Sequence, residues 1–123
     1  MKRKLSSVIV LAILISLFLT IPALAAKSYY AERFDVQIDV QEDGSAVVTE
    51  TVEFHFSDDP FTYVFRDVSA TETDRITFLD ASMDGVPMQH GTQAGRAEVK
   101  EGDPLKVTWH FPPTSAAAHT CTL

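Results

Sequence analysis

A two-residue alternation of apolar and polar side chains is the feature that most limits the fold of this chain. From Phe34 to Val40, the even positions are Phe, Val, Ile and Val, and the odd positions are polar. A second run extends from Leu105 to Phe111 and has Trp109 among its apolar positions. Successive side chains of a strand point to opposite faces, so each run predicts a strand with one buried and one hydrated face. We expect Trp109 to anchor the core.

Turn residues mark where these strands reverse. Gly44 follows Glu42-Asp43 and predicts a tight turn, so residues 45–56 should pair antiparallel with residues 34–40. Asp84-Gly85 predicts a two-residue hairpin turn. Further strands are expected over residues 61–66, 75–83, 86–90 and 96–100. Beyond residue 26 no segment has helical periodicity for three turns, so we expect almost no helix there.

Seven or eight short strands, with no room for crossover helices, predict an all-β domain. We expect an antiparallel β-sandwich with an immunoglobulin-like two-layer arrangement. The segment from Ala116 to Leu123 has the pattern of a strand that begins after Pro112-Pro113. We therefore expect a truncated C-terminal strand, which would leave the domain incomplete at its C-terminus.

The first residues have the three parts of an export signal. Lys2-Arg3-Lys4 precedes an apolar stretch, and Pro22 is followed by Ala23-Leu24-Ala25, which suits cleavage after residue 25. The alternative is a retained anchor, because Leu5 to Ala26 is an uncharged run long enough to cross a bilayer. We expect residues 1–25 to form a helical signal peptide and residues 26–123 an exported domain at the cell envelope or extracellular face, with membrane association as the alternative to a free domain.

Charge and cysteine content exclude some functions. Residues 26–123 carry seven basic and 17 acidic side chains, a formal net charge of −10. Nucleic acid requires clustered Lys and Arg, so an acidic domain of this kind is a poor nucleic-acid binder. Cys121 is the single cysteine, and it therefore has no partner for an intrachain disulfide.

One buried ion pair is expected. Glu50 has the same parity as Val52 and Phe54, so a regular strand would direct its carboxylate toward the core. Arg66 can hold a buried carboxylate at two points, and we take Glu50 and Arg66 as a structural pair that fixes strand register. Removing either residue alone should then destabilise the domain by about 3–5 kcal/mol. The alternative is a bulge around Val47-Val48 that would turn Glu50 out to water.

No catalytic, cofactor-binding or metal-ligating set is evident. His55 and His110 occupy polar positions of two strands that could be neighbours, but a third zinc ligand is missing. Ser57 and Asp58 lie near His55, without the geometry of a nucleophile elbow. Two acidic turns could converge on a calcium ion, although their spacing does not resemble a calcium loop; they contain Glu42, Asp43, Asp58 and Asp59.

An aromatic face lies on the expected strand over residues 61–66. Phe61, Tyr63 and Phe65 share one parity. We expect this face to pack into the core, and the alternative is a platform for a carbohydrate or a protein partner.

Several short segments resemble one family when taken in order. The strand-turn-strand of residues 34–56 has Asp43-Gly44-Ser45 at its turn and Val48-Thr49-Glu50 leading into Val52. It is followed by Arg66-Asp67-Val68, by Val107-Thr108-Trp109 and, after a Pro-rich loop, by Cys121-Thr122-Leu123. This series resembles the predicted membrane proteins catalogued as domain of unknown function 2207 (DUF2207). The resemblance implies a signal peptide, an extracytoplasmic β domain and later transmembrane helices, without implying an activity.

The sequence departs from that family in two respects. Ser69 follows Val68 where the family often has a proline, and the chain stops before any transmembrane helix. A membrane attachment would therefore come from the signal segment or from a C-terminal anchor that is not in this chain.

Two functions are consistent with these observations. The first is a non-catalytic extracytoplasmic interaction module that contacts an unknown envelope protein or surface component through an edge strand or through the loops Asp67 to Asp74 and Gly91 to Gly95. The second is an envelope hydrolase or metal-dependent enzyme whose site is completed by residues absent from this chain. Catalytic groups converging in one cleft would favour the enzyme.

Overall fold

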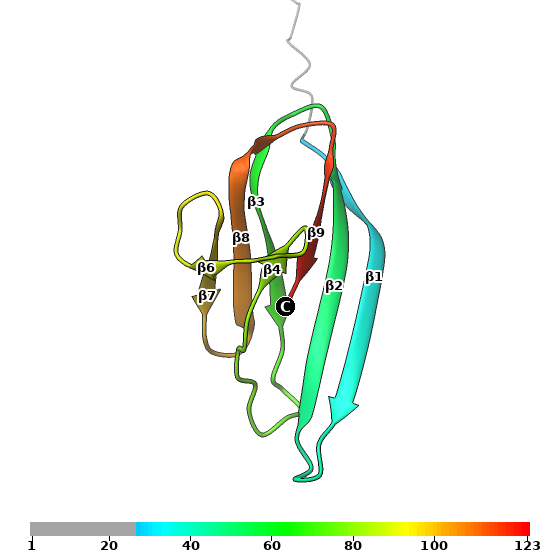
Figure 1. The fold of residues 1–123 in the computed structure, drawn as a ribbon, viewed down its shortest axis with the longest axis vertical. Coiled ribbons are helices and arrows are strands. Elements are labelled where there is room, and N and C mark those ends of the chain that lie inside the picture. The colour runs from blue at the N-terminus through cyan, green and yellow to red at the C-terminus, as the bar shows by residue number, and fades with distance from the viewer. Residues whose placement is uncertain (1–26) are drawn as a thin grey trace, which may run out of the picture.

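The computed structural model describes residues 27–123, so the predicted signal peptide lies outside the described residues. This part of the chain folds into strands and contains no helix, which confirms the all-β prediction (Figure 1). The strands are β1 (Tyr29–Val40), β2 (Ala46–Phe56), β3 (Phe61–Val68), β4 (Ser82–Met83), β5 (Val86–Pro87), β6 (Gln89–His90), β7 (Arg96–Lys100), β8 (Leu105–Thr114) and β9 (Ala118–Thr122).

The strands form two sheets that enclose a common core. The first sheet has the order β1-β2-β9-β4-β5 and the second has the order β3-β8-β7-β6. All neighbours pair antiparallel except β6 and β7, which pair parallel and correct the expectation of a purely antiparallel arrangement. The predicted strand over residues 86–90 is divided, because the chain passes from the first sheet to the second at Met88, whose N–H donates to the Ala81 carbonyl at 2.9 Å.

The core follows the alternation in β2 and β8. Leu105, Val107, Trp109 and Phe111 are each at most 2% exposed, as the period of two predicts. Trp109 Nε1 also donates to the Ser82 carbonyl at 3.1 Å, so its polar edge is satisfied. The inward residues of β2 that complete this core are Val52, Phe54 and Phe56.

The expected strand over residues 75–83 is wrong for most of its length. Only Ser82–Met83 forms a strand, and the residues before it are irregular. Phe78 packs against the core whereas Leu79 is 70% exposed. Residues 75–83 are apolar at both odd and even positions, so they lack the alternation that marks a strand with one buried face. Their apolar content alone was therefore not sufficient to predict strand pairing.

The aromatic face of β3 is also not a single face. A register shift lies between Phe61 and Tyr63, so Phe61 packs against the core while Tyr63 and Phe65 are 53% and 45% exposed. Val64 takes the buried position instead. The irregularity lies in β8, where Phe111 to Pro113 stand opposite the single residue Thr62. This interruption of the ladder corrects the expectation that all three aromatic rings are buried.

β1 and β2 form the long hairpin that the turn at Gly44 predicts. Gly44 has a φ of 86°, and Gln41 N–H donates to the Ser45 carbonyl at 2.8 Å. The Asp43 carboxylate accepts hydrogen bonds from the side chain and backbone of Ser45, which lower the pKa of Asp43. The predicted antiparallel pairing of residues 34–40 is therefore confirmed, with Val40 opposite Ala46.

The far half of this hairpin departs from the expected burial. Its inward apolar side chains are 46–76% exposed, because the second sheet does not cover this part of the first sheet (Figure 1). We call this surface the hairpin apolar face; it consists of Phe34, Val36, Ile38, Val40 and Val48.

Candidate functional site

The Glu50 carboxylate points into the space between the sheets, as the parity of β2 predicts. The pairing of β2 with β1 is continuous from Ala46 to Glu53, so there is no bulge at Val47-Val48 to turn Glu50 outward. Arg66 Nε donates to Glu50 Oε2 at 2.6 Å, and Arg66 Nη2 donates to Glu50 Oε1 at 3.2 Å. The structure therefore brings the two residues together in a two-point contact.

Arg66 lies where the closed core meets the hairpin apolar face. Its guanidinium carbon is 5.3 Å from the centre of the Phe34 ring, and its Nη1 donates to the Asp67 carbonyl at 3.0 Å. The hydrogen bond to Glu50 raises the pKa of Arg66. The ion pair therefore lies at the boundary between the closed core and the hairpin apolar face.

β1 has a free edge along its whole length. It pairs with β2 on one side and has no strand on the other among residues 27–123. Glu50 exchanges both backbone hydrogen bonds with Leu123, so even-numbered residues of β2 bond toward β9 and odd-numbered ones toward β1. By the register of β1, the backbone groups of Phe34, Val36 and Ile38 therefore point to the free edge.

From Phe34 to Val40 the charge on this edge has one sign. The outward side chains of β1 include Asp35 and Asp39, and no Lys or Arg occurs from Phe34 to Thr49. A strand pairing with β1 would therefore meet apolar side chains on one face and carboxylates on the other.

A groove opens between β1 and β3, which are the edge strands on the same side of the two sheets. Tyr29 of β1 makes an edge contact with Phe61 of β3, with ring centres 5.8 Å apart. Lys27 Nζ donates to the Pro60 carbonyl at 2.8 Å at one end. The groove is lined by Lys27, Tyr29, Phe54, Phe61, Thr62, Tyr63, Val64 and Phe65.

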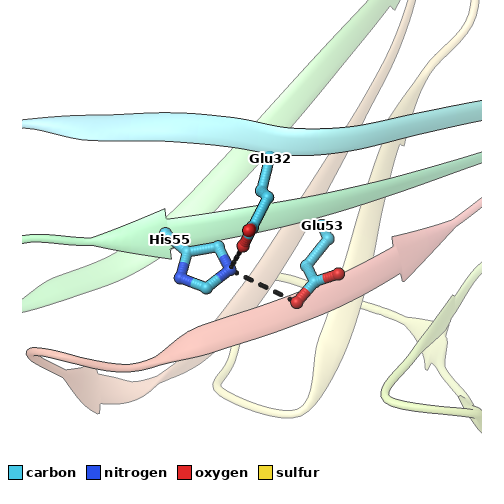
Figure 2. Close-up of side chains that lie close together, drawn as sticks. All are labelled: Glu32, Glu53 and His55. Carbon is cyan, nitrogen blue, oxygen red and sulfur yellow. Dashed lines mark hydrogen bonds and ion pairs between the residues drawn. The ribbon is translucent and has the colours of Figure 1, made fainter.

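A third feature lies on the outer face of the first sheet. His55 Nε2 forms ion pairs with Glu32 and with Glu53, the latter at 3.3 Å, as Figure 2 shows. Parity alone could not bring Glu32 to this face, because the bulge in β1 lies between Ala31 and Arg33. No sequence signal we used indicates that bulge, so this cluster was missed.

His55 and His110 do not lie on neighbouring strands, so they cannot share a zinc ion. β2 and β8 belong to different sheets, and both histidines lie on outward faces, so they are on opposite sides of the molecule. His110 Nε2 lies 3.3 Å from Glu98 instead, and His110 and Lys100 lower the pKa of Glu98.

The two acidic turns do not converge either. Glu42-Asp43 and Asp58-Asp59 lie at opposite ends of β2, and its 11 residues separate them. At about 3.4 Å per residue the separation is roughly 35 Å, which excludes a shared calcium ion.

Of the two loops expected to serve as contact surfaces, one begins later than expected and the other has the expected bounds. Asp67 and Val68 belong to β3, so the expected loop begins at Ser69, where the Ala70 N–H donates to Asp103 Oδ1 at 2.9 Å. Gly91 to Gly95 connects β6 and β7, as predicted.

The fold and these surfaces define a class of two-sheet β domain with an open edge. Residues 30–119 match the family described as "Predicted membrane protein (DUF2207) N-terminal domain". The chain belongs to this family, which confirms the resemblance found in the sequence and associates the chain with membranes. Neither the curated proteins nor the solved structures gave a significant match. Between residues 27 and 123 there is no helix with the length and hydropathy that crossing a membrane requires.

Proposed function

We propose that this domain is a non-catalytic, extracytoplasmic interaction module of a membrane protein. In this proposal residues 1–25 direct export, and residues 26–123 form an immunoglobulin-like sandwich whose β1 edge takes up a strand from a separate envelope protein. Strand addition at an open edge is a common mode of peptide recognition, in which backbone hydrogen bonds give affinity and side chains give selectivity.

The observation that carries the proposal is the unprotected edge of β1. Edge strands of soluble domains are commonly shielded by Pro, Lys, bulges or a covering segment. From Phe34 to Val40 the edge has no Pro, Lys or bulge, and its pairing with β2 is regular. Val36 and Ile38 are 47% and 60% exposed on the face that an added strand would extend.

Charge indicates which strand would fit. In a two-fold antiparallel pairing of two β1 edges centred on Gln37, Asp35 of one copy would lie opposite Asp39 of the other, and like charges directly opposite one another are destabilising. A strand that alternates apolar residues with Lys or Arg would instead pair its cations with these carboxylates. The partner is therefore inferred to be an apolar and basic strand of another protein and not a second copy of this chain.

The test uses an end-blocked octapeptide of alternating valine and lysine and the full 123-residue chain. We expect saturable binding, measured by fluorescence anisotropy, that weakens as salt is raised. The Val36→Pro variant removes only an N–H that points to the free edge, so β1 should still pair with β2 while peptide affinity falls at least tenfold. Val36→Ala, which keeps the N–H, is the matched control.

Thermal melts verify that Val36→Pro is folded. If it is not, the same octapeptide with alternate backbone nitrogens methylated tests the wild-type chain directly, and it should not bind. The proposal is wrong if the valine-lysine peptide does not bind, or if a valine-aspartate peptide, the methylated peptide or folded Val36→Pro gives equal binding.

A further inference from the structure

We propose that Glu32, Glu53 and His55 form a zinc-binding site on the outer face of the first sheet. The site is distinct from the surface proposed for the strand partner, because none of its three residues belongs to the edge segment Phe34 to Val40. In Figure 2 both carboxylates are directed at the same imidazole nitrogen, with Glu32 on β1 and Glu53 and His55 on β2.

The backbone of β1 assembles the cluster. Ala31 pairs with Phe54 and Arg33 pairs with Glu53, so Glu32 is an extra residue with no partner of its own in β2. A bulge of this kind redirects the side chain of the extra residue. Without it, β1 would supply only Tyr30 and Arg33 to this part of the outer face, and the second carboxylate would be missing.

The ligand atoms are already close to the arrangement that a zinc ion needs. The three candidate atoms all lie within 4.8 Å of one another, and Glu53 Oε1 is 3.3 Å from His55 Nε2. Tetrahedral zinc with bonds of about 2.0–2.2 Å separates its ligands by roughly 3.3–3.5 Å. Small side-chain rotations would therefore suffice to bind the ion.

The imidazole is oriented by a group other than the carboxylates. The Tyr30 ring stacks on His55 with a centre separation of 5.1 Å and an angle of 11° between the planes. The His55 side chain is 29% exposed, so the imidazole is not sealed from solution. A partly fixed imidazole loses less conformational entropy on binding than a free one does.

The charge balance also favours a cation. His55 Nε2 offers at most one hydrogen to the two carboxylates, and within residues 27–123 neither glutamate forms an ion pair with Lys or Arg. A divalent ion would neutralise both carboxylates. Nitrogen ligation favours zinc over calcium and magnesium, which prefer oxygen ligands, and three protein ligands leave a fourth zinc position for water.

The test titrates zinc chloride into the metal-free full chain by isothermal calorimetry, with cobalt(II) absorption as a second readout. We expect one zinc per chain and the intense visible bands of four-coordinate cobalt. His55→Ala and Glu32→Gln should each weaken binding at least tenfold, and calcium should not compete. Both side chains are on the outer surface, and thermal melts establish that the variants remain folded.

The matched control is His110→Ala. His110 and Glu98 form a similar pair on the other sheet, but Lys100 takes the place of a second carboxylate there. Zinc affinity should be unchanged in this variant. If wild type binds no zinc, or if His55→Ala binds as tightly as wild type, the assignment is wrong. An equal loss in His110→Ala would also overturn it, because binding would then be spread over surface histidines.

Discussion

Replacing Arg66 by methionine tests how much the contact with Glu50 stabilises the fold. The substitution keeps a long side chain that can still pack against Phe34, but it removes both hydrogen bonds to the carboxylate. The Glu50 side chain is only 10% exposed, so the carboxylate would be left without its partner in a place that water reaches poorly.

The expected loss is about 2–3 kcal/mol. Breaking a fully buried ion pair by removing one partner costs about 3–5 kcal/mol. The Arg66 side chain is 36% exposed, so water can enter the position it vacates and solvate part of the remaining charge. We therefore take a value below the sequence-based estimate. For a domain of this size, that loss corresponds to a decrease of roughly 10–20 °C in melting temperature.

Urea denaturation of the full chain measures this loss, and Arg33→Met is the control. Arg33 also pairs with a carboxylate, that of Asp35, but the two side chains are 69% and 51% exposed. Such surface pairs contribute about 0–1 kcal/mol, so the control should change stability very little. Equal losses in Arg66→Met and Arg33→Met would refute the argument from burial.

A double-mutant cycle with Glu50→Gln separates the pair from the individual side chains. The double variant should lose less stability than the sum of the two single losses, because no unpaired charge remains. Additive losses would show that the two residues stabilise the domain independently.

Three further predictions concern the C-terminal strand. Burial raises the pKa of the Cys121 thiol to about 12, so iodoacetamide at pH 8 should label it roughly a thousandfold more slowly than an ordinary thiol, and rapid labelling of folded protein would contradict this. Between about pH 9 and 12 the thiol of Cys121 is protonated in the folded chain and ionised in the unfolded chain, so unfolding releases a proton. The free energy of unfolding should therefore fall as the pH rises through this range, and urea titrations at alkaline pH measure the decrease. Asp84→Ala removes the acceptor of the Thr120 N–H at 2.8 Å and the contact with His119 Nδ1 at 2.6 Å, and it should cost about 1–3 kcal/mol. Hydrogen exchange at Thr120 should accelerate, whereas unchanged exchange would count against a stabilising role for Asp84.

The alternation of side chains predicted the strands but not what covers them. The buried positions of β8 and the direction of Glu50 follow directly from parity. Phe34 to Val40 has the same alternation, yet its apolar side is uncovered, because burial depends on whether another sheet lies opposite. A local pattern contains no information about the extent of a distant strand such as β3.

Bulges account for most of the remaining errors. Two extra residues of β8, opposite the interval from Phe61 to Tyr63, divided a predicted aromatic face, and one extra residue of β1, between Ala31 and Arg33, created the cluster around His55. Pro112-Pro113 marks the irregular part of β8, whereas no Gly or Pro marks the bulge at Glu32. Because a bulge is set by the pairing with a neighbouring strand, the sequence of one strand did not show it.

The bulge at Glu32 has a consequence at the level of the gene. Removing this one codon would join Ala31 to Arg33 and restore an unbroken ladder, with Tyr29 and Phe34 still on the same side of the sheet. Removing the codon of Asp35 instead would put Arg33 and Phe34 out of phase with β2, so that Phe34 would point to the outer face. In-frame deletions along β1 are therefore unequal, and Glu32 is the residue that can be lost without disturbing the fold.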